Sequence, residues 1–346
     1  MSSEEVIIAL DGMGGDLAPG SVIEGAYLAS KKLLNIKFNI FGNKNKILPI
    51  LKKKKEILNL VNFRHTKEII TNDTKPTDAL KKSKRMSSMF QAINSVHKGE
   101  SQAVVSGGNT GALMAISIVL LKTIKGIDRP AIASMFPTIK SETIMLDLGA
   151  NINCSLKNIL DFVILGKTFA KTVLGLKKPK IGILNVGSEG LKGNELVRLA
   201  SLKLSKNISD VDFYGFVEGN DISKGIVNVI VTDGFTGNIA LKTAEGTAEL
   251  YTNFLKSSFK DNLLSKIIFL IASPILKSLL DRVDPSKYNG AMLLGLNGIV
   301  VKSHGGSKAE GFANAISVAY DLCVNDFNQK IIVDIKNNLK LSIFKK

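Results

Sequence analysis

Six segments of this chain share one order: a short apolar run, a loop rich in glycine, and a stretch with the residue spacing of a helix. The apolar runs do not alternate with polar residues, which is typical of strands buried on both faces of a parallel sheet. The sequence therefore predicts an α/β fold, a three-layer α/β/α sandwich with a mainly parallel sheet. The six segments are VIIALDGMGGDLAPG, AVVSGGNTGALMAISIVLL, TIMLDLGANINCS, IGILNVGSEGLKGNELVRLA, NVIVTDGFTGNIALKTAEGTAEL and GIVVKSHGGSKAEGFANAISVAY.

The glycine loops, most clearly the one in the second segment, raise the question of whether they bind a ligand. A glycine turn between the strand Ala103–Ser106 and the following helix leaves several backbone N–H groups pointing into one small space, and such a nest binds anions. The same residues also fit a tight connection that binds nothing. Because loops at the carboxyl ends of parallel strands share one edge of a sheet, we expect the six loops to converge there, where ligands bind.

Two nucleotide-binding motifs are absent from these loops. A dinucleotide fingerprint that starts at Gly12 needs a third glycine at position 17, which is Leu17, and no acidic residue ends a strand near position 32. No GxxxxGK[ST] sequence occurs either. The loops are therefore not predicted to bind a dinucleotide or to hydrolyse a nucleotide.

The polar residues of the loops suit a small oxyanion such as inorganic phosphate, because lysines, amides and free backbone N–H groups bind such anions well. No GxSxG nucleophile elbow is present, and we expect Cys154 to be a small, partly buried residue rather than a nucleophile. His65 and His97 are predicted to be structural or on the surface, whereas His304, at a strand end before two glycines, is predicted to be functional. The loop residues in question are Asn109, Asn151, Lys192, Asn194, Asp233, Asn238, Lys302 and His304.

Length and composition fit one globular body with anionic partners. The chain has 346 residues, only two cysteines without metal-binding spacing, and no signal-peptide pattern at its start, which predicts a cytoplasmic location. Its net charge of +16 favours anionic partners. Nucleic acid is disfavoured because aromatic residues make up 6% and no recognition motif occurs. Lysine runs such as Lys52–Lys55 are best explained as a solvated surface.

One apolar segment, Phe254–Val283, breaks the pattern. Its longest uncharged run, Ile267–Leu276, has ten residues and is too short to span a bilayer, which takes about 20. Pro274 should divide it into two helices. Lysines beside Leu, Ile and Phe suit a helix that lies in a lipid interface, and a buried helical hairpin at a dimer contact fits equally well.

Taken in order, the loops resemble the PlsX family, the phosphate acyltransferases of bacterial phospholipid synthesis. The resemblance runs from Ile7 to about Ala319, and only the last twenty or so residues lack a counterpart. One departure is Ser188 beside Glu189, where the family usually has two adjacent acids. The matching motifs are ALDGMGGDLAP, KPTDALKKSKRMSSM, SGGNTGALMA, RPAIASMFPT, LDLGANINCS, NVGSEGLKGNEL, GFVEGNDI, VTDGFTGNIALKTAEG and LLGLNGIVVKSHGGSKAEGFANAI.

The resemblance implies a fold similar to phosphotransacetylases and isocitrate-type dehydrogenases, a homodimer, and transfer of a long acyl chain from acyl carrier protein to phosphate. Phosphate itself attacks, so no cofactor, metal or protein nucleophile is expected, and the enzyme positions the phosphate and stabilises the oxyanion. Lys192 and Lys302 would hold phosphate, Asn109 and Asn238 could donate to phosphate or the oxyanion, and His304 or Asp233 could orient phosphate or move a proton. Further predicted substrate contacts are Gly14, Gly15, Thr110, Asn151 and Ser303.

The resemblance also implies partners and an organisation of the chain. Acyl carrier protein is acidic and would use part of the positive charge for docking. Because an acyl phosphate is amphiphilic, we assign the apolar segment to an anionic membrane surface, near a downstream glycerol-3-phosphate acyltransferase. The membrane contacts would be Ile267, Ile268, Phe269, Leu270 and Ile271. We expect one acyltransferase domain over residues 1–330, a helical projection over 254–283 and a basic tail over 331–346.

Two other hypotheses compete with this one. A short-chain phosphotransacetylase that uses coenzyme A has no need for the apolar segment. A basic membrane scaffold has no need for six glycine loops that carry Asn, Lys and His.

Overall fold

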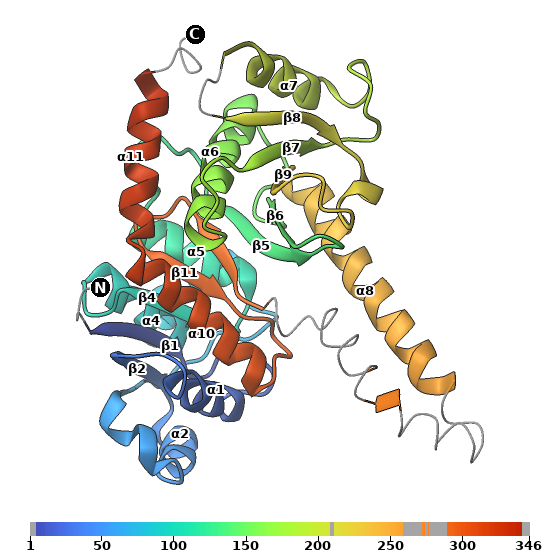
Figure 1. The fold of residues 1–346 in the computed structure, drawn as a ribbon. Helices are drawn as coiled ribbons and strands as arrows, with labels where there is room; N and C mark the ends of the chain where they lie inside the picture. Colours follow the sequence, from blue (N-terminus) through green and yellow to red (C-terminus); the bar gives the residue numbers. More distant parts are fainter. Residues whose placement is uncertain (1–4, 208–210, 259–271, 274–275, 277–288, 341–346) are drawn as a thin grey trace.

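The computed structural model describes residues 5–207, 211–258, 272–273, 276 and 289–340 (Figure 1). These residues form one sheet of 11 strands in the order β3-β2-β1-β4-β11-β10-β5-β6-β9-β7-β8. The strands are β1 (Val6–Asp11), β2 (Ile36–Gly42), β3 (Val61–His65), β4 (Ala103–Ser106), β5 (Ala131–Pro137), β6 (Glu142–Leu146), β7 (Lys180–Leu184), β8 (Asp212–Val217), β9 (Val229–Val231), β10 (Ala291–Leu294) and β11 (Ile299–Lys302).

Helices cover both faces of this sheet, and each of the six predicted units is present as a strand followed by a helix. Short 3₁₀ helices occur at Lys55–Leu60, Lys82–Met86 and Gly219–Asp221. The α-helices of the described residues are α1 (Gly20–Ser30), α2 (Lys44–Leu51), α3 (Pro76–Ala79), α4 (Ser88–His97), α5 (Thr110–Leu121), α6 (Leu156–Val173), α7 (Glu195–Asn207), α8 (Gly234–Ser258), α10 (Ala309–Val324) and α11 (Phe327–Lys340).

The core consists of two apolar layers, one on each side of the sheet. In β1, Ile8 and Leu10 face one layer with α1, α6, α10 and α11, whereas Ala9 faces the other layer with α4 and α5. An uninterrupted apolar strand supplies both layers because successive side chains point to opposite faces. The predicted three-layer sandwich is confirmed.

The sheet is not parallel throughout. β10 runs antiparallel to both β11 and β5, and β5 runs antiparallel to β6, whereas every other neighbouring pair is parallel. Three reversals therefore separate β11 from β6. Consequently β1, β4 and β11 run in one direction, and β6, β9 and β7 run in the opposite one.

The C-terminal boundary predicted at residue 330 is wrong. Helix α11 continues to Lys340, and its Ile331 and Ile335 are buried in the core. The Thr168 hydroxyl on α6 donates to Asp334 Oδ2 at 2.7 Å, and the buried Lys167 lies 3.8 Å from the same oxygen. The basic composition of these residues concealed an amphipathic helix that packs on α6.

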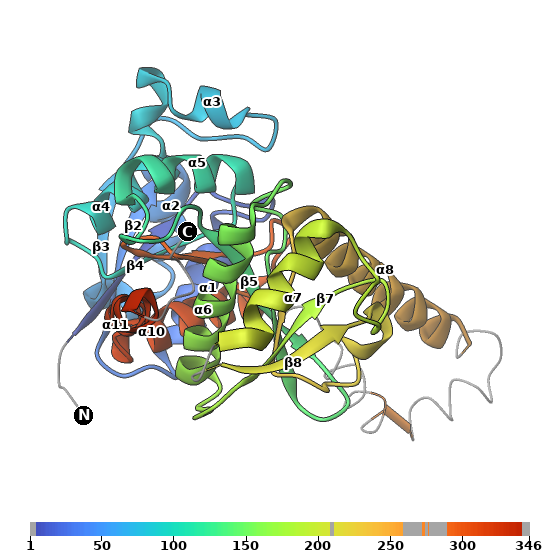
Figure 2. The same cartoon turned by 90° about the horizontal axis from the view of Figure 1, so that it is seen from above.

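Helix α8 extends away from the sheet toward residue 258 (Figures 1 and 2). The predicted projection over 254–283 therefore begins inside a 25-residue helix rather than at a new element. The membrane contacts at residues 267–271 and the break at Pro274 lie outside the described residues. Within the described part of the chain, no helix has the length and apolarity that a bilayer span requires.

Candidate active site

The strand directions divide the six glycine loops into two groups. The first group follows β1, β4 and β11, and the second follows β6, β7 and β9. Because these two sets of strands run in opposite directions, their loops leave from opposite ends of the strands. The prediction that all six loops share one edge is therefore wrong, and the reason is the antiparallel pairing of β10 and β5 in the middle of the sheet.

The three loops of the first group pack directly against one another. The backbone N–H of Asp16 donates to the carbonyl of Gly305 at 2.8 Å. A Cβ on Gly107 would lie 2.8 Å from the carbonyl oxygen of Gly14, and one on Gly15, where φ is +112°, would lie 3.1 Å from that of Gly305. Glycine is required here because the backbones themselves are in contact. Gly14 and Gly15 thus lie where the three loops meet, and their predicted contact with phosphate stays a prediction.

Three helices start from this nest. α1, α5 and α10 follow the loops after β1, β4 and β11, so their N-terminal ends face the same region. The first N–H groups of a helix lack partners within the helix, and the helix dipole places partial positive charge there. The first group therefore favours an anion before any side chain is considered.

Lys302 adds a cation to the nest. It ends β11, and its Nζ donates to the carbonyl oxygens of Ser303 and of Gly107, the latter at 3.4 Å. Burial lowers the pKa of Lys302 to about 8, although the carboxylates of Asp16 and Asp11 oppose the shift. A desolvated ammonium group with a lowered pKa is under-solvated, and an anion bound beside it would restore its charge balance.

Asp11 lies beneath the loops and was missed by sequence reasoning. It is 1% exposed, and its Oδ2 accepts a hydrogen bond from the Ser106 hydroxyl at 2.7 Å. Burial raises the pKa of this carboxyl group, while hydrogen bonds from Ser88 and Ser106 and the charge of Lys302 lower it. A Cβ on Gly14 would collide with Asp11 Oδ2, so the close approach of loop and carboxylate requires glycine. The signal in the sequence was an acid that ends an apolar strand directly before a glycine loop.

The side chain of Asn109 is engaged in hydrogen bonds with neighbouring backbone groups. Its Oδ1 caps α5 by accepting from Ala112 N–H at 2.9 Å, and its Nδ2 donates to the carbonyls of Asn72 and Thr74 at 2.7 and 3.1 Å. These bonds hold the 71–74 loop beside the nest. In this arrangement Asn109 is a positioning residue, and the exposed Thr110 is the first residue of α5.

The residues after Lys302 are fixed by Asn289, another residue that the sequence did not reveal. Asn289 Nδ2 donates to the buried Ser303 hydroxyl at 2.8 Å, and its Oδ1 accepts from the His304 N–H at 2.8 Å. The exposed His304 ring accepts from Gly306 N–H through Nδ1 at 3.2 Å. In its neutral form His304 therefore carries its proton on Nε2, which is available to a substrate at the surface of the nest.

The second group of loops is organised around a buried carboxylate. Asp147 is fully buried and accepts from the N–H groups of Ile132, Ala150 and Asn151 and from the Asn151 side chain, at 2.7 to 3.0 Å. Asn151 also donates to the carbonyl of Pro130 at 2.8 Å. Burial raises the pKa of Asp147, and these hydrogen bonds partly offset the rise. Asn151 thus holds loops together rather than presenting free donors.

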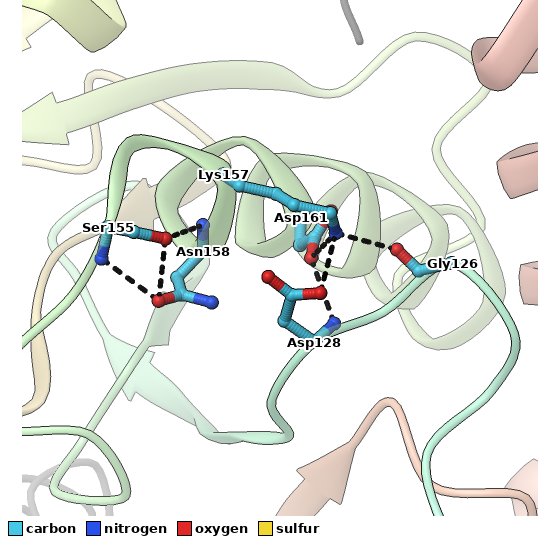
Figure 3. Close-up of polar contacts among 6 residues, drawn as sticks. All are labelled: Gly126, Asp128, Ser155, Lys157, Asn158 and Asp161. Carbon is cyan, nitrogen blue, oxygen red and sulfur yellow. Dashed lines mark hydrogen bonds and ion pairs between the residues drawn. The ribbon is translucent and has the colours of Figure 1, made fainter.

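A polar cluster at the start of α6 supports the same loops (Figure 3). Lys157 Nζ lies 2.7 Å from both Asp161 Oδ2 and the Gly126 carbonyl, and 3.3 Å from Asp128. Ser155 and Asn158 form a capping box that begins the helix. The cluster ties α6 to the segment that leads into β5, so it fixes the Pro130 carbonyl to which Asn151 binds.

Asp233 and Asn238 lie at the start of α8 in this second group. Asp233 caps the helix, because its carboxylate accepts from the N–H and the hydroxyl of Thr236 at 2.9 and 2.8 Å. The exposed Asn238 lies next to Gly149, whose added Cβ would be 3.5 Å from the amide carbon. Cys154 lies nearby, and burial together with the charge of Asp147 raises the pKa of its thiol to about 11. A thiol with that pKa is a poor nucleophile, in agreement with the sequence prediction.

Lys192 is not among the charged groups that influence the pKa of Lys302. Lys192 is exposed in the loop after β7, where its carbonyl accepts from the Asn185 side chain at 3.1 Å. β7 and β11 are five positions apart in the sheet, which separates the strands by roughly 24 Å at about 4.8 Å per position. Ser188 and Glu189 are exposed in the same loop.

A different lysine, Lys242, acts electrostatically on Lys302. Helix α8 starts in the second group at Gly234, and the positive charge of Lys242, two turns along it, contributes to the lowered pKa of Lys302. Lys242 pairs with Glu245 at 2.6 Å. Helix α8 therefore joins the two groups. Among the described residues, no cluster of three or more His, Cys, Asp or Glu side chains could hold a metal ion.

Comparisons with known proteins identify the family of this chain. Residues 6–330 match the family model described as fatty acid synthesis protein. The phosphate acyltransferase of Paramagnetospirillum magneticum is 51% identical over 95% of this chain and 93% of its own, and that of Rhodospirillum centenum is 52% identical over 95% and 92%. The chain therefore belongs to the phosphate acyltransferase family within the fatty acid synthesis proteins.

Solved structures support the fold. A phosphotransacetylase from Streptococcus pyogenes aligns over 93% of this chain and 95% of its own with a TM-score of 0.65 and 16% identity. A branched-chain phosphotransacylase from Enterococcus faecalis aligns over 92% and 99% with a TM-score of 0.59 and 14% identity. The expected similarity to phosphotransacetylases is confirmed at the level of the fold.

Proposed function

We propose that this protein transfers a long acyl chain from acyl carrier protein to inorganic phosphate and so makes acyl phosphate for phospholipid synthesis. The observation that carries the proposal is Lys302, an ammonium group of lowered pKa in a nest where three helix N-termini meet. Membership of the phosphate acyltransferase family supports the same reaction.

The reaction requires positioning more than a protein nucleophile. A phosphate oxygen forms a bond to the thioester carbonyl carbon, and the carbon–sulfur bond breaks with its electron pair going to sulfur. The thiolate then takes up a proton. Lys302 and the backbone N–H groups would hold the phosphate, and the Nε2–H of His304, whose Nδ1 accepts from Gly306, would donate to the oxyanion or to the leaving sulfur. Catalysis would arise from fixed dipoles in a partly desolvated site.

Phosphate-dependent thiol release tests the proposal. The purified chain, given hexadecanoyl acyl carrier protein, should release free carrier thiol only when phosphate is present. Arsenate should replace phosphate and yield free fatty acid, because acyl arsenates hydrolyse rapidly. Equal thiol release without either oxyanion would show that water, not phosphate, is the acceptor.

A second candidate is a phosphotransacetylase that uses coenzyme A, which the fold similarity to solved phosphotransacetylases favours. The two candidates differ in the thiol that carries the acyl group. Matched acyl thioesters of carrier protein and of coenzyme A, compared by kcat/KM, decide between them.

The carrier protein would dock on the basic segment beside the nest. Lys75, Lys81, Lys82 and Arg85 are exposed there, and Pro76 packs on the first turn of α5 at Gly111. Helix α3, which this segment contains, lies beside α5 (Figure 2). Charge reversal at Lys81 and Lys82 should raise the KM for acyl carrier protein, with a weaker effect at high salt.

The matched control for carrier docking is charge reversal at the exposed Lys52 and Lys53, which precede β3 at the other end of the strands. This double variant has the same net charge, so it should leave the carrier KM near that of the parent. Equal effects of the two double variants would mean that total charge, and not a docking surface, attracts the carrier.

The membrane assignment remains a proposal from the sequence, together with a homodimer and hand-over of product to a downstream glycerol-3-phosphate acyltransferase. Anionic vesicles should bind the chain, salt should weaken that binding, and an Ile268→Asp, Leu270→Asp double variant should lose it while keeping its mass in light scattering. If that variant loses its dimer and the parent ignores anionic vesicles, the segment is a buried dimer hairpin.

A further inference from the structure

Asp11 is a buried acidic residue beneath the phosphate nest that none of the steps proposed above uses. In the parallel pairing of β1 with β4, Leu10 lies opposite Val105, so the next residues, Asp11 and Ser106, end the two strands side by side. Asp11 is 1% exposed, and Ser106 is fully buried. Burial of a carboxyl group is costly unless hydrogen bonds compensate it, so the partners of Asp11 indicate its role.

The Ser106 hydroxyl connects Asp11 to the turn that follows β4. It donates to Asp11 Oδ2 at 2.7 Å, and its oxygen accepts from the Gly108 N–H at 3.1 Å. A hydroxyl has a single proton, so donation to the carboxyl group directs its lone pairs toward Gly108. Asp11 therefore fixes the direction of the hydroxyl, and the hydroxyl fixes the turn.

The same turn contacts Lys302. The Gly107 carbonyl accepts from Lys302 Nζ at 3.4 Å. Lys302 lies opposite Ser106 in the pairing of β11 with β4, and the Ser303 N–H donates to the Ser106 carbonyl at 2.9 Å. The three residues Ser106–Gly108 therefore link the Asp11 carboxyl group to the Lys302 ammonium group through hydrogen bonds.

Close packing encloses this turn. A Cβ on Gly107 would lie 2.8 Å from the carbonyl oxygen of Gly14, and one on Gly108 would lie 2.6 Å from the Met89 side chain on α4. Packed interiors have low compressibility and transmit small displacements. Loss of the Ser106 hydroxyl should therefore shift the Gly107 carbonyl relative to the ammonium group that it binds.

The charge of Asp11 acts in the same direction as its hydrogen bonds. Burial lowers the pKa of Lys302, and the carboxylates of Asp16 and Asp11 oppose this change, whereas the charge of Lys242 adds to it. Asp16 is exposed, while Asp11 lies beneath the loops. Asp11 therefore favours the charged form of Lys302, which is the form that binds an anion.

We infer that Asp11 is a positioning residue of the phosphate site. Through the Ser106 hydroxyl it fixes the Gly107–Gly108 turn, and this turn holds the ammonium group that binds phosphate. The inference rests on the proposed role of Lys302 in holding phosphate, and it adds the buried group that sets the geometry of that contact. Because Asp11 acts through the turn, its loss should change phosphate affinity and leave the contacts with the thioester as they are.

Removal of the Ser106 hydroxyl tests the link between Asp11 and the turn. Ser106→Ala changes no charge and should raise the KM for phosphate about tenfold, while kcat and the KM for the thioester stay within about twofold of the parent values. The matched control, Ser101→Ala, removes another buried hydroxyl just before the start of the same strand, where its oxygen accepts from Asn39 at 2.8 Å and from Ser95 at 3.1 Å. The control should lose stability in denaturant titration and keep the phosphate KM.

Two substitutions at Asp11 itself separate the hydrogen bond from a loss of packing. Asp11→Asn keeps the shape and an oxygen that can accept from Ser106, so at pH 6.5, below the pKa of Lys302, the phosphate KM should rise by less than about threefold. Asp11→Ala removes the acceptor, and the phosphate KM should rise at least about tenfold. If Asp11→Ala does not fold, as judged by circular dichroism, the decision rests on Ser106→Ala against Ser101→Ala.

Phosphate binding without turnover, measured by calorimetry, separates this inference from the proposed function. If the parent binds phosphate but releases no thiol in response, the reaction is wrong, and a tenfold weaker binding in Ser106→Ala still supports the inference. Equal phosphate affinities of Ser106→Ala and the parent overturn the inference, as do equal losses in Ser106→Ala and Ser101→Ala. A thioester KM that rises as much as the phosphate KM also overturns it, because the substitution would then disturb the whole site. A parent that binds no phosphate overturns both.

Discussion

The two groups of glycine loops have the same sequence pattern and differ in how their polar atoms are used. In the first group, around Lys302, helix N-termini and a desolvated ammonium group surround the point where three loops meet. In the second group, Asp147 and Asn151 satisfy each other and the neighbouring backbone, and Asp233 caps α8. The same loop pattern can thus leave helix N-termini around a desolvated lysine, or its polar groups can be used in hydrogen bonds that hold neighbouring segments together.

The largest expected effect is a loss of stability, and it tests whether the second group of loops has a structural role. Asp147→Ala removes the acceptor of three N–H groups, of which those of Ile132 and Asn151 are buried. Each buried group costs about 1–3 kcal/mol when left unpaired, so the free energy of unfolding should fall by at least about 2 kcal/mol. Denaturant titration measures this loss. The control Asp233→Ala removes only a helix cap, worth about 1 kcal/mol. If Asp147→Ala keeps the parent stability and loses only phosphate affinity, the second group belongs to the phosphate site.

The next effect tests the first group as an anion site. Lys302→Ala removes a charge-assisted contact worth about 1.5–3 kcal/mol, so the KM for phosphate should rise by about tenfold to a hundredfold. The KM for the acyl thioester should change much less, and stability should not fall, because the ammonium group is costly to bury. An unchanged phosphate KM would place the anion elsewhere.

A pH profile sharpens the assignment of Lys302. Its pKa of about 8 means that the cation is present at pH 7 and is lost as the pH rises through 8. The phosphate KM should therefore rise about tenfold between pH 7 and pH 9, beyond any change caused by titration of phosphate itself. Lys302→Arg stays charged throughout this range and supplies the reference profile. Parallel profiles for the parent and the Arg variant would contradict the role of Lys302.

The smallest expected effect compares the two lysines directly. Lys192→Ala should change the phosphate KM by less than about threefold, because β7 and β11 are five positions apart in the sheet. Initial-rate kinetics beside Lys302→Ala make the comparison. Equal losses in the two variants would mean that the loop after β7 reaches the nest during catalysis.

Much of the fold was predictable because its signals are local. Uninterrupted apolar runs, glycine turns and helical spacing follow one another along the chain, and each of the six predicted units has its strand and helix in the structure. The family was recognisable for the same reason, since its motifs are the loops of these units. The helix α11 was missed because basic residues cover the solvent side of a helix whose Ile331 and Ile335 are buried.

Local patterns along the chain set the units of this protein: which residues form strands, where the glycine loops lie, and which loops carry amides, lysines and a histidine. Which loops meet depends on tertiary contacts, because it follows from the direction of β10 and β5, which pair although Leu293 and Ile132 are far apart in the chain. Tertiary contacts also decide which polar groups stay available: Asn109, Asn151 and Asp233 bind neighbouring segments, whereas Lys302 remains under-solvated beside three helix N-termini. Local pattern fixes the conformation of each segment, but pairing and burial arise from contacts between distant segments, and the chemistry of the site depends on both.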